Sequence, residues 1–164
     1  MSCSIENACE LLVSTADTNK NILICGNGGS AADAQHLAAE LMVRYKKDRR
    51  PIKALSLVTD TSLLTACGND FSFDEIFSRQ VEALGNDGDL LIAFSTSGTS
   101  ENIRKAIDMA TSKQMNIIFM TGLNRYISSE HVITINITSK ETARIQEAHQ
   151  LIYHYWCEQI DSVL

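Results

Sequence analysis

Five short runs of apolar residues recur along the chain, separated by segments in which apolar residues return every three or four positions. The runs cover residues 22–25, 52–58, 90–94, 117–120 and 132–137. Most of them are nearly continuous, which is typical of strands buried on both faces of a parallel sheet. The last run alternates apolar and polar residues, which indicates an edge or half-exposed strand.

The segments between these runs carry the periodicity of amphipathic helices. They cover residues 4–17, 30–45, 72–84, 99–113 and 140–163. This alternation predicts an α/β fold, a doubly wound five-stranded parallel sheet flanked by helices, with the flavodoxin-like strand order 2-1-3-4-5. In such a sheet, ligands bind beyond the carboxyl ends of the strands, near the switch point between strands one and three. We expect one domain over residues 1–164, with a short leading helix at about residues 4–18.

Composition narrows the class of protein. The chain has 164 residues, 45% of them apolar, which is enough for one buried core. The formal net charge of −6 argues against nucleic acid as a direct partner. No apolar run approaches the ~20 residues that span a bilayer, and the N-terminus lacks the pattern of a signal peptide, so we expect no membrane partner. Five cysteines without CxxC spacing are typical of a reduced, cytoplasmic protein.

Two of the predicted strands end in loops rich in glycine and serine. The first runs into CGNGGS, residues 25–30, and the third into STSGTS, residues 95–100, and a predicted helix follows each loop. Either loop alone reads as an ordinary strand-to-helix turn or as a ligand loop. Neither is a Walker A loop, because no Gly-Lys-Ser/Thr follows. The first loop also matches the dinucleotide fingerprint poorly, which weakens that alternative.

The pair of loops is more informative than either loop alone. Strands one and three flank the switch point, so both loops and two helix N-termini face one crevice. The hydroxyls of Ser95, Thr96, Ser97 and Ser100, together with backbone N–H groups, suit the oxygens of a phosphate. The loops supply no hydride acceptor and no strong base. The sequence therefore predicts a phosphate-holding site whose chemistry comes from other residues.

Candidate chemistry lies on two predicted helices. His36 and Glu40 are four residues apart and hence on one helix face, for which a solvated polar face is the alternative. Gln146 and His154 lie about two turns apart on the last helix, and this spacing alone does not make a metal site. A further polar pair, Asn69-Asp70, sits in a predicted loop before a helix, as turn residues or as ligands.

Four segments together resemble the phosphoheptose isomerases, or sedoheptulose 7-phosphate isomerases, of the sugar isomerase (SIS) fold family. They are CGNGGSAADAQHLAAEL, GNDFSFDEIFSRQVEA, STSGTSENI and ARIQEAH with a later His. The resemblance runs in order from about residue 20 to about residue 160. The STSGTS loop marks only the wider fold family, whereas NGGS…His…Glu combined with RIQE…His is more specific.

The resemblance implies roles for individual residues. The substrate contacts would be Asn27, Gly28, Gly29, Ser30, Glu40, Asn69, Asp70, Ser95, Thr96, Ser97, Ser100 and Gln146. One zinc ion per active site would be bound by His36, Glu40, Gln146 and His154. Glu40 and His154 match the acid/base pair of the family, so Glu40 is asked to serve as both ligand and base.

The implied reaction interconverts sedoheptulose 7-phosphate and D-glycero-D-manno-heptose 7-phosphate, the first step toward nucleotide-activated heptose for lipopolysaccharide or capsule. A carboxylate can move a proton between C1 and C2 through an enediol, while an imidazole handles the protons on the oxygens. Two alternatives stay open. One is a non-catalytic binding protein like the relative that associates with the bacterial replication initiator, which lacks the acid/base pair. The other is an isomerase of another sugar phosphate.

The resemblance also implies a homo-oligomer. Family members form tetramers in which a longer N-terminal helix packs, and their active sites lie at subunit interfaces. Only about 20 residues precede the first predicted strand here. We therefore expect a homo-oligomer and leave the tetramer open.

Overall fold

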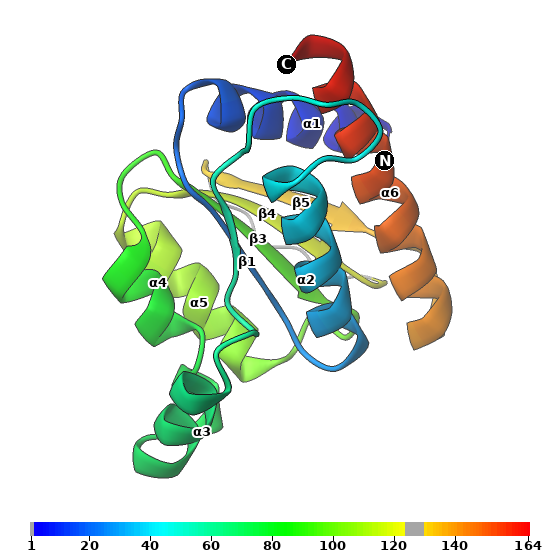
Figure 1. The fold of residues 1–164 in the computed structure, drawn as a ribbon. Helices are drawn as coiled ribbons and strands as arrows, with labels where there is room; N and C mark the ends of the chain where they lie inside the picture. The colour runs from blue at the N-terminus through cyan, green and yellow to red at the C-terminus, as the bar shows by residue number, and fades with distance from the viewer. Residues whose placement is uncertain (1, 124–129) are drawn as a thin grey trace.

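The computed structural model describes residues 2–123 and 130–164. Along the chain, its elements are α1 (Ser2–Asp17), β1 (Ile22–Gly26), α2 (Gly29–Met42), β2 (Ala54–Ser56), α3 (Thr61–Asp70), the 3-10 turn η1 (Phe73–Glu75), α4 (Ser78–Leu84), β3 (Leu90–Ser95), α5 (Glu101–Ser112), β4 (Asn116–Thr121), β5 (Val132–Asn136) and α6 (Thr142–Val163). The strands form one sheet in the order β2-β1-β3-β4-β5, and all four pairings are parallel. The predicted fold class and strand order are confirmed (Figure 1).

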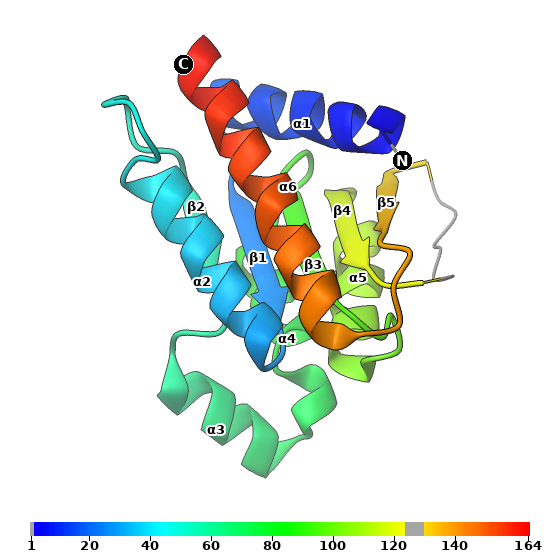
Figure 2. The same cartoon turned by 90° about the vertical axis from the view of Figure 1, so that its right-hand side faces the viewer.

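The apolar strands feed two cores because successive side chains point to opposite faces of a sheet. On one face, Ile24 and Ile92 pack with residues of α1, α2 and α6. On the other face, Leu23 and Leu91 pack with residues of α4 and α5. Figure 2 shows α2 and α6 side by side across the first face, with α1 crossing the upper part of α6. Side chains of α2 and α6 therefore meet in front of the sheet.

Two elements differ from the sequence-based expectation. The run at 52–58 forms a strand only over Ala54–Ser56, because it is an edge strand with one partner, and Leu55 is partly exposed to solvent. The helix expected over 72–84 is divided into η1 and α4. As expected, β5 is an edge strand with a mixed burial pattern.

Helix α3 was not expected, and it places Asn69 and Asp70 in its last turn, so the prediction of a loop there was wrong. The Asp60 carboxylate caps this helix by accepting a hydrogen bond from the backbone N–H of Leu63 at 2.9 Å. Among its residues only Cys67 is buried. Figure 1 shows α3 standing off from the sheet. A helix that buries so little has little apolar periodicity to reveal it in the sequence.

The cysteines are free thiols, and Cys9, Cys25, Cys67 and Cys157 are buried. Cys25 and Cys67 belong to the core cluster beside α4 and α5, as expected for small apolar side chains. Of the helices in the described part of the chain, none has the length and apolar character to cross a membrane.

Candidate active site

The two glycine-serine loops lie side by side at the carboxyl ends of adjacent strands β1 and β3. Each turns sharply through a glycine with positive φ, Gly28 at 57° and Gly98 at 66°, a conformation that a side chain would strain. Two hydrogen bonds join Asn27 of the first loop to Asn102 in the first turn of α5, directly after the second loop: Nδ2 of Asn27 donates to Oδ1 of Asn102 at 2.8 Å, and Nδ2 of Asn102 donates back at 2.9 Å. The first loop is therefore braced against the segment that follows the second loop.

The hydroxyls of the second loop are ordered by bonds within the loop. The Ser95 hydroxyl accepts from the N–H of Gly98 at 3.1 Å and donates to the Ser100 hydroxyl at 3.2 Å. The Ser97 hydroxyl accepts from the N–H of Thr99 at 3.2 Å. Helix α5 begins directly after Ser100, so its unpaired N–H groups end at the same loop. This arrangement suits an anion such as phosphate.

A cavity of about 320 Å³ adjoins this loop. Its lining residues are Thr96, Ser97, Leu123, Ser139, Lys140, Thr142 and Ile145. Lys140 lines this cavity together with Thr96 and Ser97 of the second loop, and the sequence analysis did not single it out. Its position could have been predicted, because Lys140 lies just before the last helix and therefore at the same edge of the sheet as the two glycine-serine loops.

His36, Glu40 and His154 meet in front of the sheet, where α2 and α6 pack together. Their ligand atoms all lie within 4.8 Å of one another, a spacing that one metal ion can bridge. His36 Nε2 is 3.0 Å from Glu40 Oε1. The rings of His36 and His154 meet edge to face, with centroids 5.0 Å apart. The structure thus brings together residues 118 positions apart in the sequence, His36 and His154.

Aromatic rings and ionisable side chains lie around His154. Tyr45 stacks on it with a centroid distance of 5.3 Å. Its Nε2 atom is buried and has no hydrogen-bond partner among the described residues. Burial, together with the charges of His36 and Lys46, lowers the pKa of His154, and only Glu40 acts in the opposite direction. An imidazole kept neutral with an unpaired nitrogen fits a metal ligand or a proton acceptor.

Gln146 lies against the first glycine-serine loop. A Cβ atom on Gly29 would come within 2.3 Å of Gln146 Nε2, so the start of α6 approaches the start of α2 because residue 29 has no side chain. Ser30 is buried, and its N–H bonds to the carbonyl of Asn27 at 3.0 Å. Gln146 therefore lies next to the predicted substrate loop.

Asn69 and Asp70 stand apart from these groups. The Asn69 amide donates to Asp70 Oδ1 at 2.8 Å on the exposed end of α3. Within residues 2–123 and 130–164, no side-chain hydrogen bond joins them to either loop or to Glu40. His149 also lies apart, buried against Phe94 with its pKa lowered to about 4 by burial. It is a core histidine.

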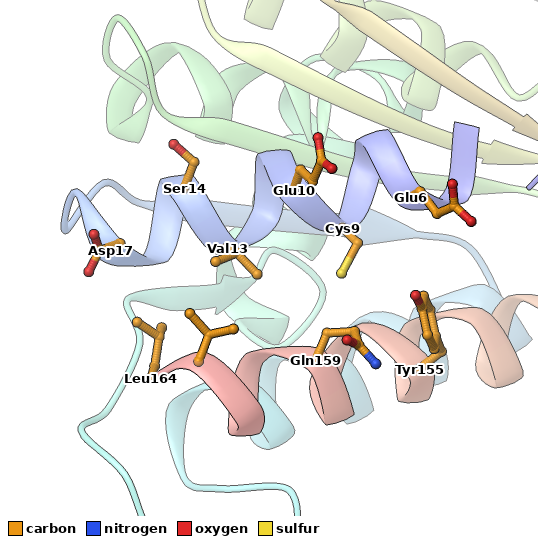
Figure 3. Close-up of a pocket in the computed structure, with 10 residues that line it drawn as sticks. Glu6, Cys9, Glu10, Val13, Ser14, Asp17, Tyr155, Gln159 and Leu164 are labelled. Atoms are coloured by element: carbon orange, nitrogen blue, oxygen red, sulfur yellow. The ribbon is translucent and has the colours of Figure 1, made fainter. Parts of the chain in front are cut away.

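A larger concavity lies elsewhere. A groove of about 720 Å³ runs between α1 and the C-terminal half of α6 (Figure 3), and it is lined by Glu6, Cys9, Glu10, Val13, Ser14, Asp17, Tyr155, Gln159, Val163 and Leu164. None of the candidate site residues lines it. The chemistry of the side chains, rather than the size of a hollow, locates the candidate site.

Comparison with known proteins identifies the family. Residues 2–122 match the family model described as the SIS domain. The phosphoheptose isomerase of Shewanella denitrificans is 50% identical over 98% of this chain and 84% of its own length, and that of Campylobacter concisus is 48% identical over 96% and 84%. The solved phosphoheptose isomerase of Neisseria gonorrhoeae superposes with a TM-score of 0.91 at 43% identity, covering 98% of this chain and 86% of that one.

A second solved structure, the phosphoheptose isomerase of Francisella tularensis, gives a TM-score of 0.92 at 37% identity over 97% of this chain and 85% of that one. Other structures, among them a Vibrio vulnificus NanR protein at 17% identity and a TM-score of 0.63, share the fold alone. Identity at this level over nearly the whole chain places it in the SIS-domain family, among the phosphoheptose isomerases.

Proposed function

We propose that this protein is an aldose–ketose isomerase that converts sedoheptulose 7-phosphate to D-glycero-D-manno-heptose 7-phosphate, the first step of nucleotide-activated heptose synthesis. The observation that carries the proposal is the meeting of Glu40 with His36 and His154 at the junction of α2 and α6. The relatives named above are phosphoheptose isomerases. A binding protein of the same fold would need no such cluster, so the non-catalytic alternative is not favoured.

In this proposal, the loop 95–100 holds the phosphate. The hydroxyls of Ser95, Thr96, Ser97 and Ser100, the N-terminus of α5 and the cation of Lys140 would face its oxygens. The sugar would extend toward the first loop, where Asn27, Gly28, Gly29 and Ser30 contact it together with Gln146. This arrangement fixes one end of the substrate and leaves the carbonyl end near Glu40.

The proton transfers are assigned to two side chains. The Glu40 carboxylate would take a proton from one of the carbons C1 and C2 and return it to the other through an enediol. The His154 imidazole would move protons on the two oxygens, for which a neutral ring with an unpaired nitrogen is suited. The Glu40 side chain is about one-fifth exposed, so it can reach a substrate in the crevice.

The donor set also fits a zinc ion. Two imidazoles and a carboxylate whose ligand atoms gather within 4.8 Å are a common zinc environment, and the buried, unpaired Nε2 of His154 is an open ligand position. We propose His36, Glu40, Gln146 and His154 as ligands. A bound zinc ion supplies positive charge that polarises the substrate carbonyl and stabilises the enediolate.

We further propose that the whole chain, residues 1–164, acts as one SIS domain, is cytoplasmic and works as a homo-oligomer. Free, buried cysteines agree with a reducing compartment. Exposed apolar side chains such as Leu151 and Phe71 are surfaces that another copy would cover. In such an assembly, Asn69 and Asp70 would contact substrate in the site of a neighbouring copy, which accounts for their position on α3.

The test is turnover of sedoheptulose 7-phosphate by the wild type and by Glu40→Gln and His154→Gln. Loss of one proton-transfer group is expected to lower kcat about 10²–10⁴-fold. Glu10→Gln, a change on the exposed face of α1, is the matched control and should keep full activity. Full activity in Glu40→Gln would refute the role of Glu40. A panel of ketose phosphates with five, six and seven carbons identifies the preferred substrate.

A further inference from the structure

Tyr45 lies against the ring of His154 but takes no part in the proposed proton transfers. The two rings stack, with centroids 5.3 Å apart and planes at 30°. Tyr45 belongs to the connection between α2 and β2, residues 43–53, which contains no helix or strand. Figure 1 shows this connection, in cyan, passing beside α6. An aromatic side chain that a loop brings onto a proposed catalytic ring needs an explanation.

The other rings around His154 come from the helices and meet it differently. Tyr153 of α6 makes a T-shaped contact at 4.9 Å and 86°, and His36 of α2 makes another at 5.0 Å and 78°. Tyr45 is the stacked neighbour, so its ring covers one face of the imidazole. The torsion that turns a histidine ring about its Cβ–Cγ bond has a broad preference, so the neighbouring side chains decide the plane of the ring. A stacked ring restricts this torsion because rotation drives the imidazole into it.

The loop that carries Tyr45 is fixed to α6 by one carboxylate. Asp161 Oδ2 accepts hydrogen bonds from the backbone N–H groups of Lys46 and Lys47, at 2.8 and 2.9 Å. Its other oxygen, Oδ1, accepts from Nε of Arg49 at 3.0 Å. The Asp161 side chain is 3% exposed, so water competes little for these bonds. The residue directly after Tyr45 is therefore held in place by three charge-assisted hydrogen bonds to this carboxylate.

The anchor and the ring that Tyr45 covers belong to the same face of the same helix. His154 and Asp161 are seven residues apart in α6, which is about two turns. Helix α6 thus presents His154 and also holds the loop whose aromatic side chain lies on it. The position of Tyr45 relative to His154 is consequently set by the fold, before any ligand binds.

We propose that Tyr45 is a positioning residue whose ring, anchored to α6 through Asp161, fixes the plane of the His154 imidazole. The inference rests on the proposed function in taking His154 as the group that moves protons on the substrate oxygens. Such a group must keep its nitrogen aimed at two atoms in turn, and a displacement of about 1 Å can cost on the order of 10²-fold in rate. The stacked phenol supplies the constraint that the torsion of the imidazole lacks.

The first experiment compares the kinetics of Tyr45→Ala and Tyr45→Phe with sedoheptulose 7-phosphate. Tyr45→Ala removes the stacked ring and should lower kcat about 10–100-fold with KM unchanged. Tyr45→Phe keeps the ring and should restore kcat to near the wild-type value. Tyr155→Ala, which removes a partly exposed ring in the groove beside α1, is the matched control and should act as the wild type does.

Three kinetic outcomes would overturn the proposal. Wild-type kcat in Tyr45→Ala would show that the ring does not position His154. A higher KM with unchanged kcat would make Tyr45 a substrate contact instead. A loss in Tyr45→Phe as large as that in Tyr45→Ala would assign the effect to the hydroxyl rather than to the stack.

The second experiment reads the position of the ring without turnover. In protein with ¹³C-labelled histidine, the His154 ring protons are assigned by their loss in His154→Gln. They should show NMR cross-peaks to the rings of both Tyr45 and Tyr153, because these rings lie in contact. In Tyr45→Ala the cross-peaks to Tyr153 should weaken as the imidazole turns, and in Tyr45→Phe they should persist. Unchanged cross-peaks to Tyr153 in Tyr45→Ala would contradict the proposal.

The same spectra test the anchor. Asp161→Asn removes the charge that holds the loop, so the cross-peaks between Tyr45 and His154 should weaken, whereas Asp108→Asn on the exposed face of α5 should leave them unchanged. Full cross-peaks in folded Asp161→Asn would show that Asp161 is not the anchor. The Tyr45 variants keep the test decisive if Asp161→Asn does not fold, because they change only a side chain on a loop.

The two kinds of readout separate this inference from the proposed function. Turnover by the wild type with a His154 ring that does not respond to Tyr45→Ala would leave the isomerase in place and remove the positioning role. A ring that turns in Tyr45→Ala, in a protein that converts no sugar phosphate, would do the reverse.

Discussion

Asn27 in the first loop and Asn102 in the first turn of α5, which follows the second loop, exchange two side-chain hydrogen bonds at 2.8 and 2.9 Å. Asn102 is almost fully buried, so neither amide is replaced easily by water. The predicted substrate contact Asn27 therefore has a structural partner that the sequence did not reveal. The pair sets the separation of the loops before any ligand binds.

Asn102→Ala should loosen this brace. It leaves the Asn27 amide without its buried partner, which we expect to lower the free energy of unfolding by about 1–3 kcal/mol and to raise KM for the sugar phosphate. Urea unfolding and steady-state kinetics measure the two effects. Asn7→Ala on the exposed face of α1 should change stability by less than about 0.5 kcal/mol. Equal stability of the two variants would show that the reciprocal pair does not brace the loops.

Gly29→Ala should displace Gln146. The added Cβ would lie 2.3 Å from Gln146 Nε2. Because this atom is at the movable end of a side chain, we expect the protein to fold with the Gln146 amide displaced. Affinity for zinc and for substrate should both fall if Gln146 contacts them. Gly68→Ala in α3, where a Cβ meets nothing within 4 Å, is the control and should leave both affinities unchanged. Chelator competition and KM report the effect, and wild-type values in Gly29→Ala would remove Gln146 from the site.

Lys140 should act on the phosphate end of the substrate. It lines the cavity that Thr96 and Ser97 also line, so its charge is expected to attract phosphate oxygens. Lys140→Met should raise KM about 10-fold and change kcat little, since an exposed charge-assisted contact contributes on the order of 1.5 kcal/mol. Lys140→Arg should restore most of the affinity. If KM stays at the wild-type value in Lys140→Met, the cation serves another purpose.

Most of the strands could be predicted because a strand buried on both faces of a parallel sheet has a nearly continuous apolar sequence. The runs at 22–25, 90–94 and 117–120 match β1, β3 and β4 to within one residue at either end. The strand predicted over 52–58 was too long. An edge strand pairs with only one neighbouring strand, and apolar residues of this run pack in the core outside the strand. Leu57, for example, packs in the core beyond the end of β2.

Some parts of the candidate site could also be predicted from the sequence, and others could not. The phosphate loops could be located from topology, because strands one and three are adjacent at the switch point of such a sheet. The contact of His36 with His154 could not be derived from spacing, because it depends on how α2 and α6 pack, and the resemblance to a family supplied it. Tyr153 escaped notice because it reads as an ordinary helix residue. Its hydroxyl lies 3.1 Å from His36 Nδ1, a contact that exists only across two helices.

A buried ion pair beside the C-terminal end of α2 should make the fold sensitive to acid. Arg49 donates to the backbone carbonyls of Glu40 and Leu41, at 2.8 and 2.9 Å, and to Asp161 Oδ1 at 3.0 Å. The two charged side chains are at most 3% exposed. The pair thus ties the end of α2, with the proposed catalytic carboxylate, to α6.

The sign of the acid effect follows from the pKa of Asp161. Burial alone would raise it, but the N–H groups of Lys47 and Lys46 and the guanidinium of Arg49 outweigh burial and lower it. Because the folded pKa lies below that of the unfolded chain, about 3.9, the carboxylate stabilises the fold above that pH. The stabilisation is lost as the pH falls from about 4 through the folded pKa.

Asp161→Asn should therefore destabilise the protein by about 3 kcal/mol at neutral pH, because it leaves the Arg49 charge buried and unpaired. The gap between the wild type and the variant should narrow as the pH falls below about 4, where the wild type also loses the charge. Urea unfolding at several pH values measures both curves. Asp108→Asn on the exposed face of α5 controls for the loss of one carboxylate and should follow the wild type. A constant gap between wild type and Asp161→Asn at all pH values would mean that Asp161 stabilises the fold by packing alone and not through its charge.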